Sequence, residues 1–568
     1  MININDWRHY SPQTLIDFVK VYDDSAESLN RIEKAYIFAE DKHQYQPPRD
    51  SGEPFISHPV ACANFLAIMR MDIDSIVAGL LHDTLEDTDA TYPEIKEKFG
   101  SDVAILVADV TKFNRLEDAN LDDFRLQIDI NDPGELEMLN RRKFIETILL
   151  DPRSGIIKGS GDRIHNMLTL EFKTPMKQQE KARETLDVYA PLMHYYGIYR
   201  TQQLLEDSSL KYLSPEHQDV YKTIAANRQI VKDKNLPFLN DILQSIIEEI
   251  RKNIKMVGHY DSTEMLHKSE EELLNETILV GESLSRSRIK HVYGIYDAFR
   301  KIKNFQTVDK AELDIINGMA KDEQYFDMIH DLRVIKLIMK DEISCWLARK
   351  ILCDMYPPID KYQHNYIANP KYNGYQSFHE TASINGKLVQ FQIRTEKQEH
   401  RNTYGLAWES YKFQGPNTRE RILEEFKKYP IYGRLAELSR DRTIKTLGEY
   451  GHSLESNVLK VNEISVIDKI SGRTRSIKEG STIHDFAYLI GGHKGDHLSK
   501  AIVNDVVYTF PVDEKGNIDF DSYPFDLKLE PGDEIYVEFD EKINCKKPKR
   551  NLSSNSAKKL TNISEEVE

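Results

Sequence analysis

The spacing of apolar residues changes along the chain from a helical period to a strand period, and this change limits the folds that are possible. Residues 1–210 carry apolar side chains at helical spacing, as in 73–81, with no alternating stretch between them. Residues 276–415 mix helical segments with strands, of which 387–395 alternates most clearly. Residues 456–540 are rich in short strands separated by Gly and Pro turns. The sequence therefore predicts a multidomain protein of the α and α+β classes.

These patterns divide the chain into five segments. In the mixed segment we expect buried strands at 277–280 and 332–339 and helices at 293–303 and 341–354. The connector is expected to be helical and to be interrupted once, at Pro237. The expected segments are an all-helical domain over 1–210, a helical connector over 211–258, an α/β domain over 259–440, a small β-rich domain over 456–540, and a disordered tail over 541–568.

Composition excludes several classes of protein. A chain of 568 residues with 40% hydrophobic and 30% charged residues is typical of globular proteins with several domains. The net charge of −17 argues against a non-specific nucleic-acid binder. The start has no signal-peptide pattern, and no apolar run is long enough to span a membrane. We therefore expect a cytoplasmic protein, with reduced cysteines because the four are scattered: Cys62, Cys345, Cys353 and Cys545.

Four histidine and aspartate residues of the helical region could bind one metal ion. His58 stands in ISHP, the adjacent pair His82 and Asp83 in LLHDTLEDT, and Asp162 in GDRIHN. Imidazole and carboxylate ligands together suit a divalent metal of intermediate hardness such as manganese. A plainer alternative for each motif is a surface hydrogen bond or a solvated helix end, but the four motifs together favour a metal site.

Polar residues beside this set could serve a metal-bound water. Glu86 lies four residues after His82, on the same helical face, and Asp87 adjoins it. Asn166 lies four residues after Asp162. A metal lowers the pKa of its water, and a neighbouring carboxylate can orient or deprotonate that water. The pattern indicates metal-assisted hydrolysis of a phosphoester.

The first 210 residues resemble a known hydrolase. RDSGEPFISHP, LLHDTLEDTDAT, VADVTK, GDRIHNMLTL and ETLDVYAPLMH resemble, in order and spacing, the HD hydrolase domain of the RelA/SpoT-type alarmone synthetase/hydrolase family, over about 30–210. The family enzyme, a guanosine-3′,5′-bis(diphosphate) 3′-pyrophosphohydrolase of the stringent response, converts guanosine tetra- or pentaphosphate to GDP or GTP plus pyrophosphate. One departure is Asp50, where the family usually has a basic residue, which would weaken the positive charge at the pocket mouth.

The resemblance also implies roles for single residues. It implies that manganese is bound by His58, His82, Asp83 and Asp162. It also implies that the catalytic water is served by Glu86 and Asp87, and that the nucleotide is contacted by Arg49 and Asn166. HD phosphohydrolases share their metal ligands, so the choice of a guanosine substrate depends on the family resemblance alone.

The mixed domain resembles the synthetase domain of the same family, which has a nucleotidyltransferase-like fold. The motifs are SRSRIKHVYGIY, HDLRVIKLIM, NYIANPKYNGYQSFHETA and VQFQIRT, over about 240–415. The resemblance implies that Tyr375 stacks on guanine, that Arg288, Lys290 and His291 meet ATP phosphates, and that Asp331 binds Mg²⁺.

Several residues that the synthetase reaction needs are replaced. The second family carboxylate corresponds to Gln390, and an amide cannot serve as an anionic ligand or a base. Ala298 stands for a Lys, and Lys336 for an Arg. We expect synthesis to be impaired or lost. The alternatives are a nearby acid such as Glu380 or Glu396 that restores a bifunctional synthetase/hydrolase, and a nucleotide-sensing regulatory protein that binds GDP, GTP or ATP without turnover.

The last domain resembles a TGS domain, a small β-grasp fold, over about 457–540. The motifs are GSTIHDFAYLIG, AIVND and LEPGDEIYVEF. In long family members this domain contacts tRNA on the ribosome. A His that usually follows the FAYxI segment is Gly491 here, and the chain ends soon afterwards. We therefore expect contact with tRNA and the ribosome to be weak or absent, and a structural or intramolecular role for the domain.

Overall fold

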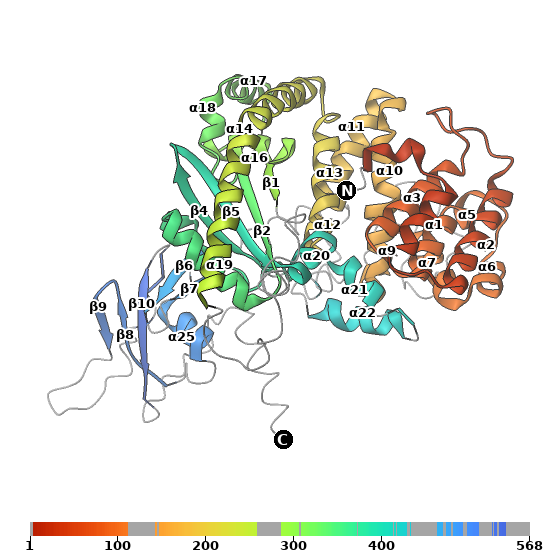
Figure 1. Ribbon diagram of the computed structural model, residues 1–568. Helices are drawn as coiled ribbons and strands as arrows, with labels where there is room; N and C mark the ends of the chain where they lie inside the picture. Colours follow the sequence, from red (N-terminus) through yellow and green to blue (C-terminus); the bar gives the residue numbers. More distant parts are fainter. Residues whose placement is uncertain are drawn as a thin grey trace, which may run out of the picture.

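The computed structural model contains a helical domain, a mixed α/β domain and a small β domain (Figure 1). The expected strand at 277–280 and the expected tail at 541–568 lie outside the described residues. The structure describes residues 4–111, 143–144, 147–257, 286–305, 308–371, 373–412, 414–415, 417–428, 432, 463–469, 473–478, 481–491, 497–509, 525, 527–530 and 533–540.

The helical domain buries one continuous apolar core. Helix α3 is buried along its whole circumference, as expected for a central helix with no polar stripe. Helix α4 begins at the N-cap Asp72, whose carboxylate accepts the Ser75 N–H at 3.1 Å. The elements are η1 (Ile4–His9), α1 (Pro12–Lys20), α2 (Ala26–His43), α3 (Ser57–Ile68), α4 (Ile73–Leu81), α5 (Thr84–Asp87), α6 (Tyr92–Phe99), α7 (Ser101–Val110), α9 (Pro152–Ile156), η4 (Ile157–Asp162), α10 (Arg163–Leu168), η5 (Leu170–Phe172), α11 (Pro175–Glu184), η6 (Thr185–Tyr189), α12 (Ala190–Tyr195) and α13 (Tyr199–Leu210).

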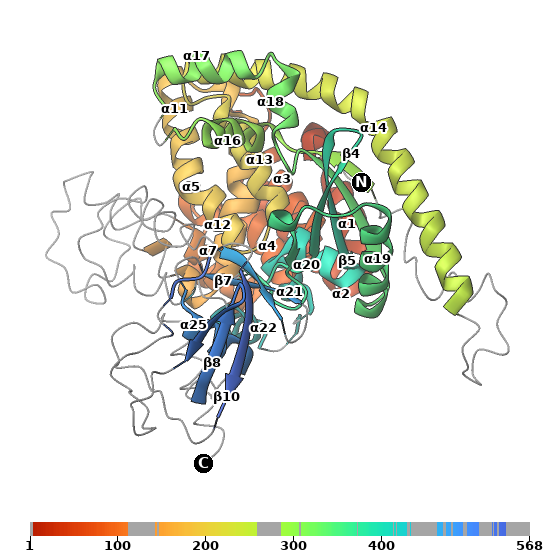
Figure 2. The same ribbon diagram turned by 90° about the vertical axis from the view of Figure 1, so that its left-hand side faces the viewer.

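The connector is one helix, α14 (Pro215–Val257), and the expected interruption at Pro237 is wrong. The apolar face of α14 packs into the core of the second domain through residues such as Val231 and Leu239 on both sides of the proline. Proline removes one N–H, and the carbonyl that it would have bonded belongs to the exposed Asp233, where water can satisfy it. Packing therefore keeps the helix continuous, as its path in Figure 2 shows.

The second domain contains a mixed sheet of order β1-β2-β5-β4-β3. Strands β2 and β5 run parallel, and the other neighbours are antiparallel. One sheet face, with Val389, Phe391 and Ile393, packs against helices, while the opposite face carries polar side chains. The elements are β1 (Arg286–Ile289), α16 (Val292–Ile302), α17 (Lys310–Met319), α18 (Glu323–Asp327), β2 (Arg333–Met339), α19 (Glu342–Met355), η8 (Asp360–Tyr362), β3 (His364–Asn365), β4 (Phe378–Ile384), β5 (Lys387–Thr395) and α20 (Glu396–Tyr404).

The third domain has a second mixed sheet, of order β7-β6-β10-β8-β9, in which β10 and β6 are parallel. Val466, Phe486 and Ile535 lie in its small core. The described elements are β6 (Glu463–Asp468), β7 (Arg473–Lys478), α25 (Ile483–Gly491), β8 (Leu498–Val503), β9 (Val506–Thr509) and β10 (Glu534–Phe539). The predicted multidomain α and α+β class is confirmed, while the TGS assignment and the exact domain limits stay predictions. None of the described helices combines the length and apolar character that crossing a bilayer requires.

The chain returns to the helical domain after the second sheet. Helices α21 (Leu406–Lys412) and α22 (Thr418–Lys427) lie beside α9 in Figure 1, and Leu406, Ala407 and Phe426 belong to the helical domain's core. The approach is close: a Cβ on Gly405, which has φ +53°, would lie 2.0 Å from the Tyr196 carbonyl oxygen. The backbone that follows the second sheet therefore packs directly against the backbone of the helical domain.

A buried arginine connects two segments of the helical domain. Arg153 has no exposed surface, and its guanidinium donates to Asp151 at 2.7 Å and to Asp72 at 3.1 Å. Asp72 begins α4, and Arg153 lies in α9. Removing one partner of a buried ion pair leaves an uncompensated charge, which is more costly than the pair is stabilising.

We predict that Arg153→Met lowers the free energy of unfolding of the helical domain by about 3–5 kcal/mol, because Asp72 and Asp151 lose their buried partner. Urea unfolding of the metal-free protein measures this change. The control is Lys350→Met, which removes an exposed ion pair with Asp354 and should leave the transition unmoved. Equal transitions for wild type and Arg153→Met would contradict the prediction.

Candidate functional site

The four side chains predicted to bind metal lie together at the centre of the helical domain. His58 Nε2 is 3.5 Å from an oxygen of Asp83 and 3.4 Å from an oxygen of Asp162. His82 Nε2 is 3.0 Å from the other Asp83 oxygen and 3.2 Å from His58 Nε2. Two imidazole nitrogens and two carboxylates thus face one point, although Asp162 is 79 residues from Asp83, its nearest predicted partner in sequence.

Each of these residues lies at or near the end of a helix, where a side chain can leave the core. His58 is in the first turn of α3, His82 is the C-cap of α4, and Asp83 precedes α5. Asp162 ends η4, a π-helical turn between α9 and α10. Such turns are rare and often occur at functional sites. Small residues let this turn pack closely, since a Cβ on Gly159 would lie 2.5 Å from the Met193 methyl carbon.

The donor set fits a divalent cation. Ligand atoms that share an ion lie close to one another, as these do, and the combination of nitrogen and oxygen donors suits metals such as manganese. Cys62 is also near, with its Sγ 3.9 Å from His58 Nε2. Burial raises the pKa of the Cys62 thiol well above its usual range, so it is a poor ligand compared with the two carboxylates.

Both aspartates of this set stay ionised, and His58 stays neutral. Burial raises the pKa of Asp162, but the Lys158 ammonium, 3.0 Å from the carboxylate, outweighs this effect. The pKa of Asp162 therefore lies well below its usual range, and the group stays ionised. For Asp83 burial is likewise outweighed by His82, and its pKa falls well below the usual range. Burial lowers the pKa of His58 to about 4, which leaves the imidazole neutral and able to bind metal.

The two acids predicted to serve a water lie on α5, next to Asp83. Burial, Asp83 and Glu86 together raise the pKa of Asp87 to about 6. Asp162, Asp83 and Glu86 outweigh burial and raise the pKa of Lys158. Burial lowers the pKa of Lys143 to about 8, although the charge of Glu86 acts in the opposite direction. A carboxyl group with a raised pKa beside a metal site is suited to proton transfer near neutral pH.

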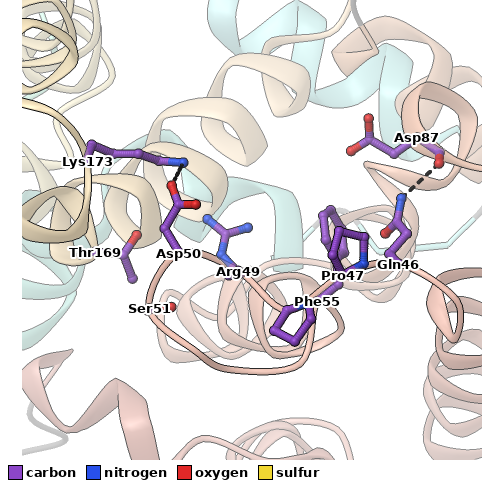
Figure 3. Close-up of a pocket in the computed structure, with 10 residues that line it drawn as sticks. Gln46, Pro47, Arg49, Asp50, Ser51, Phe55, Asp87, Thr169 and Lys173 are labelled. Atoms are coloured by element: carbon purple, nitrogen blue, oxygen red, sulfur yellow. Dashed lines mark hydrogen bonds and ion pairs between the residues drawn. The ribbon is translucent and has the colours of Figure 1, made fainter.

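A cavity of about 320 Å³ is lined by Arg49 and Asp87, among other residues (Figure 3). Arg49 lines it and donates to the Asn166 amide oxygen at 3.2 Å, while the Asn166 NH₂ group donates to Asp162. The predicted nucleotide-binding pair therefore joins the cavity to a predicted metal ligand. The residues that line the cavity are Gln46, Pro47, Pro48, Arg49, Asp50, Ser51, Phe55, Asp87, Thr169 and Lys173.

Asp50, which replaces the usual basic residue of the family, forms an ion pair with a lysine. The Lys173 ammonium pairs with the Asp50 carboxylate across the cavity mouth, as Figure 3 shows. Lys173 thus supplies a cation at this mouth, and Asp50 neutralises it. Both side chains are about half exposed.

The basic residues predicted to meet ATP in the second domain are paired with acids or buried. Lys290 pairs with Asp331, and His291 Nε2 lies 2.9 Å from the carboxylate of Glu206, on α13 of the helical domain. Burial lowers the pKa of Arg288, whose Nε has no hydrogen-bond partner among the described residues. The structure groups Arg288, Lys290 and Asp331, and turns His291 towards the other domain.

Gln390 lies on the polar face of the sheet, in a chain of side-chain hydrogen bonds. Its amide oxygen accepts from Gln392 at 2.8 Å, and Gln392 accepts from Arg394. The acid that reaches this face is Glu399 of α20, which pairs with Arg394 at 3.3 Å and with Lys336 at 2.9 Å.

The two acids considered as substitutes for the missing carboxylate have other partners. Glu380 lies opposite Phe391 in the strand register, on the apolar side, and pairs with Arg349. Glu396 begins α20 and lies 3.7 Å from His400.

Tyr375 is almost buried and has several partners. Its hydroxyl lies 2.7 Å from His379 Nε2, and the Arg394 guanidinium lies over its ring at 5.2 Å. Tyr199 of α13 packs edge-on against the ring, with centroids 5.5 Å apart. The helical domain therefore covers part of the side chain that was predicted to stack on guanine.

The sequence reasoning missed three residues of these sites. Lys158 and His165 contact predicted metal ligands, and Glu399 pairs with the bases of the second site. The position of Lys158, four residues before Asp162, was a usable signal. His165 was visible in GDRIHN, but its partner is 107 residues away in sequence.

Comparison with known proteins matches both larger domains. The HD domain family matches residues 35–199, and the region found in RelA / SpoT proteins matches residues 287–415. The chain belongs to the RelA/SpoT family.

Three relatives illustrate the similarity. The probable guanosine-3′,5′-bis(diphosphate) 3′-pyrophosphohydrolase of Synechocystis is 30% identical, over 83% of this chain and 54% of that protein. The guanosine-3′,5′-bis(diphosphate) 3′-pyrophosphohydrolase of Aquifex aeolicus is 32% identical, over 86% and 60%. The bifunctional (p)ppGpp synthase/hydrolase SpoT of Escherichia coli is 31% identical, over 82% and 56%. The matched region thus spans somewhat more than half the length of these relatives.

We predict that Asp50→Asn strengthens the binding of inorganic pyrophosphate at the cavity, because it frees the Lys173 ammonium and removes one negative charge. Isothermal titration at low ionic strength measures the affinity, and the gain should shrink as salt is added. Asp314→Asn, at an exposed site on α17, is the control and should change nothing. Weaker binding by Asp50→Asn would contradict the assignment of the cavity.

Proposed function

We propose that this protein is a manganese-dependent guanosine-3′,5′-bis(diphosphate) 3′-pyrophosphohydrolase. It converts guanosine tetraphosphate to GDP, and the pentaphosphate to GTP, with release of pyrophosphate. The observation that carries the proposal is the convergence of His58, His82, Asp83 and Asp162 beside a cavity lined by Arg49. The names of the relatives from Synechocystis and Aquifex aeolicus support the choice of substrate.

The residues divide the work according to their positions. The two histidines and two aspartates would hold a divalent ion, which would lower the pKa of a water bound there. Glu86 and Asp87 stand on the next turn to orient that water and accept its proton. Arg49 offers its guanidinium to a phosphate of the substrate, which suits a planar, fork-shaped donor. Asn166 is hydrogen-bonded to both Arg49 and Asp162, and so fixes the position of the phosphate-binding guanidinium relative to the metal site.

The second domain is proposed to have lost most or all synthesis. Transfer of pyrophosphate from ATP needs Mg²⁺ held by carboxylates, and Gln390 supplies an amide. Glu399 reaches the same sheet face, but it is paired with two bases, Lys336 and Arg394. Asp331 is likewise paired with Lys290. A nucleotide would have to break these pairs to bind Mg²⁺ and phosphate there.

Two further expectations remain with the proposal. The described cysteines Cys62, Cys345 and Cys353 are free thiols, which suits the proposed cytoplasmic location. The third domain is proposed to be a TGS-type unit, because its mixed sheet and single described helix suit a β-grasp fold.

We predict that the purified protein with Mn²⁺ releases pyrophosphate from guanosine tetraphosphate and that Asp83→Ala reduces the rate to background, since one anionic ligand is lost. Chromatography of the nucleotides together with a pyrophosphate assay measures both products. Asp314→Asn, at an exposed site in the other domain, is the control and should retain the rate. A normal rate for Asp83→Ala would refute the proposed site, and turnover of other nucleotides in preference to this one would refute the substrate.

The synthetase prediction uses a chain whose hydrolase is disabled by His82→Ala, so that any product accumulates. With ATP, GDP and Mg²⁺ we expect no 3′-diphosphate product, because the second carboxylate is absent. Gln390→Glu on the same background returns that carboxylate and is the variant in which any rescued synthesis should appear. Product formation by the chain with Gln390 intact would show a bifunctional enzyme instead.

A further inference from the structure

The two histidines of the metal site are oriented by different partners. His82 Nδ1 lies 2.9 Å from the carbonyl oxygen of Gly79, which can only accept a hydrogen bond. His82 Nδ1 therefore carries the proton, and Nε2 keeps its lone pair for a metal. Among the described residues, no carbonyl oxygen plays this part for His58. Its Nδ1 lies 2.9 Å from Nδ1 of His165, and both rings are buried.

A bond between two imidazoles allows two arrangements of protons. If His165 donates, His58 carries its proton on Nε2, the atom that faces Asp83 and Asp162, and that atom cannot bind a metal. If His165 accepts, the proton is on His58 Nδ1 and the Nε2 lone pair is available. The Cys62 Sγ, at 3.9 Å from His58 Nδ1, is a weak and distant alternative acceptor. Metal binding by His58 therefore requires His165 to accept.

The surroundings of His165 are apolar on its other side. Its Nε2 is buried and has no hydrogen-bond partner among the described residues. The Trp7 indole packs edge-to-face against the ring, with centroids 4.7 Å apart. Neither a proton nor a lone pair on His165 Nε2 therefore meets a polar partner among the described residues. The hydrogen bond with His58 is thus the contact that decides which nitrogen of His165 carries the proton.

We propose that His165 is a positioning residue of the metal site, which accepts the Nδ1 proton of His58 and thereby presents the His58 Nε2 lone pair to the cation. The inference rests on the proposed metal site and goes beyond it. Partners of this kind around metal-binding histidines typically change metal affinity or activity by about 10- to 100-fold when they are removed. His165 does not line the cavity, so it does not act by touching substrate.

The test compares two substitutions of His165 in the full chain. His165→Phe keeps a ring of similar size but removes the acceptor, whereas His165→Asn can place its amide oxygen near the position of Nδ1. Titration with Mn²⁺, followed by the electron paramagnetic resonance signal of the free ion, gives the affinity without any turnover. His165→Phe should bind Mn²⁺ about 10- to 100-fold more weakly, and His165→Asn should recover most of the loss.

Two controls separate positioning from folding. His194→Phe makes the same change at a half-buried histidine whose ring contacts Tyr195 and Tyr199, and it should leave Mn²⁺ affinity unchanged. Thermal unfolding without metal shows whether each variant folds. At saturating Mn²⁺ the KM of His165→Phe for guanosine tetraphosphate should equal that of wild type, because the cavity is intact.

The outcomes distinguish this inference from the proposed function. Wild-type affinity in a folded His165→Phe chain would overturn the role of His165, even if the enzyme hydrolyses guanosine tetraphosphate. Equal losses of Mn²⁺ affinity in the Phe and Asn variants would show that His165 acts only through packing, and would also overturn the inference. If the wild type binds Mn²⁺ but does not turn over this nucleotide, the proposed function fails, and the affinities still decide the role of His165.

Discussion

Two carboxylates, Asp83 and Asp162, face the same imidazole nitrogen of His58 in a mostly buried pocket, and their charges repel each other unless a cation lies between them. The Lys158 ammonium offsets part of this charge from one side. A divalent ion would neutralise the rest and use the two histidines as well. A separate buried ion pair connects the segments that carry these ligands. Arg153 joins the start of α4 to α9, and these segments lead to His82 and Asp162.

The second domain handles its charges in the opposite way. Its sheet also presents bases and acids on one face, but Lys336 and Arg394 share Glu399, and Lys290 pairs with Asp331. The polar face is therefore neutralised by side chains of the chain itself. The helical domain keeps a set of donors that needs an added cation, while the second domain has its own countercharges in place. This asymmetry is the physical basis for our proposal that one domain hydrolyses and that the other has lost most or all synthesis.

Local patterns predicted the elements well where one physical cause dominates. The apolar periods of 73–81 and 387–395 gave α4 and β5, because each segment packs as its own period requires. Pro237 misled the prediction, since packing along α14 outweighs one lost hydrogen bond. The return of α21 and α22 to the first core had no local signal, because it depends on contacts between segments more than 200 residues apart.

In the candidate site, too, local motifs predicted some residues, while others depended on contacts between distant segments. The motifs around His58, His82, Asp83 and Asp162 predicted that these side chains would meet, and the structure brings them together. The residues that orient them were less visible. His165 acts through His58 across the fold, and a single histidine in a helix has many plainer explanations than a hydrogen bond to a metal ligand.

The central claim is that one divalent cation is held by these two histidines and two aspartates. Diffraction from crystals grown with Mn²⁺, recorded at the manganese absorption edge, tests it most directly. The account predicts one strong anomalous peak in the helical domain, in contact with His58 Nε2, His82 Nε2 and oxygens of Asp83 and Asp162. A peak elsewhere in the chain, or none at saturating Mn²⁺, would contradict it.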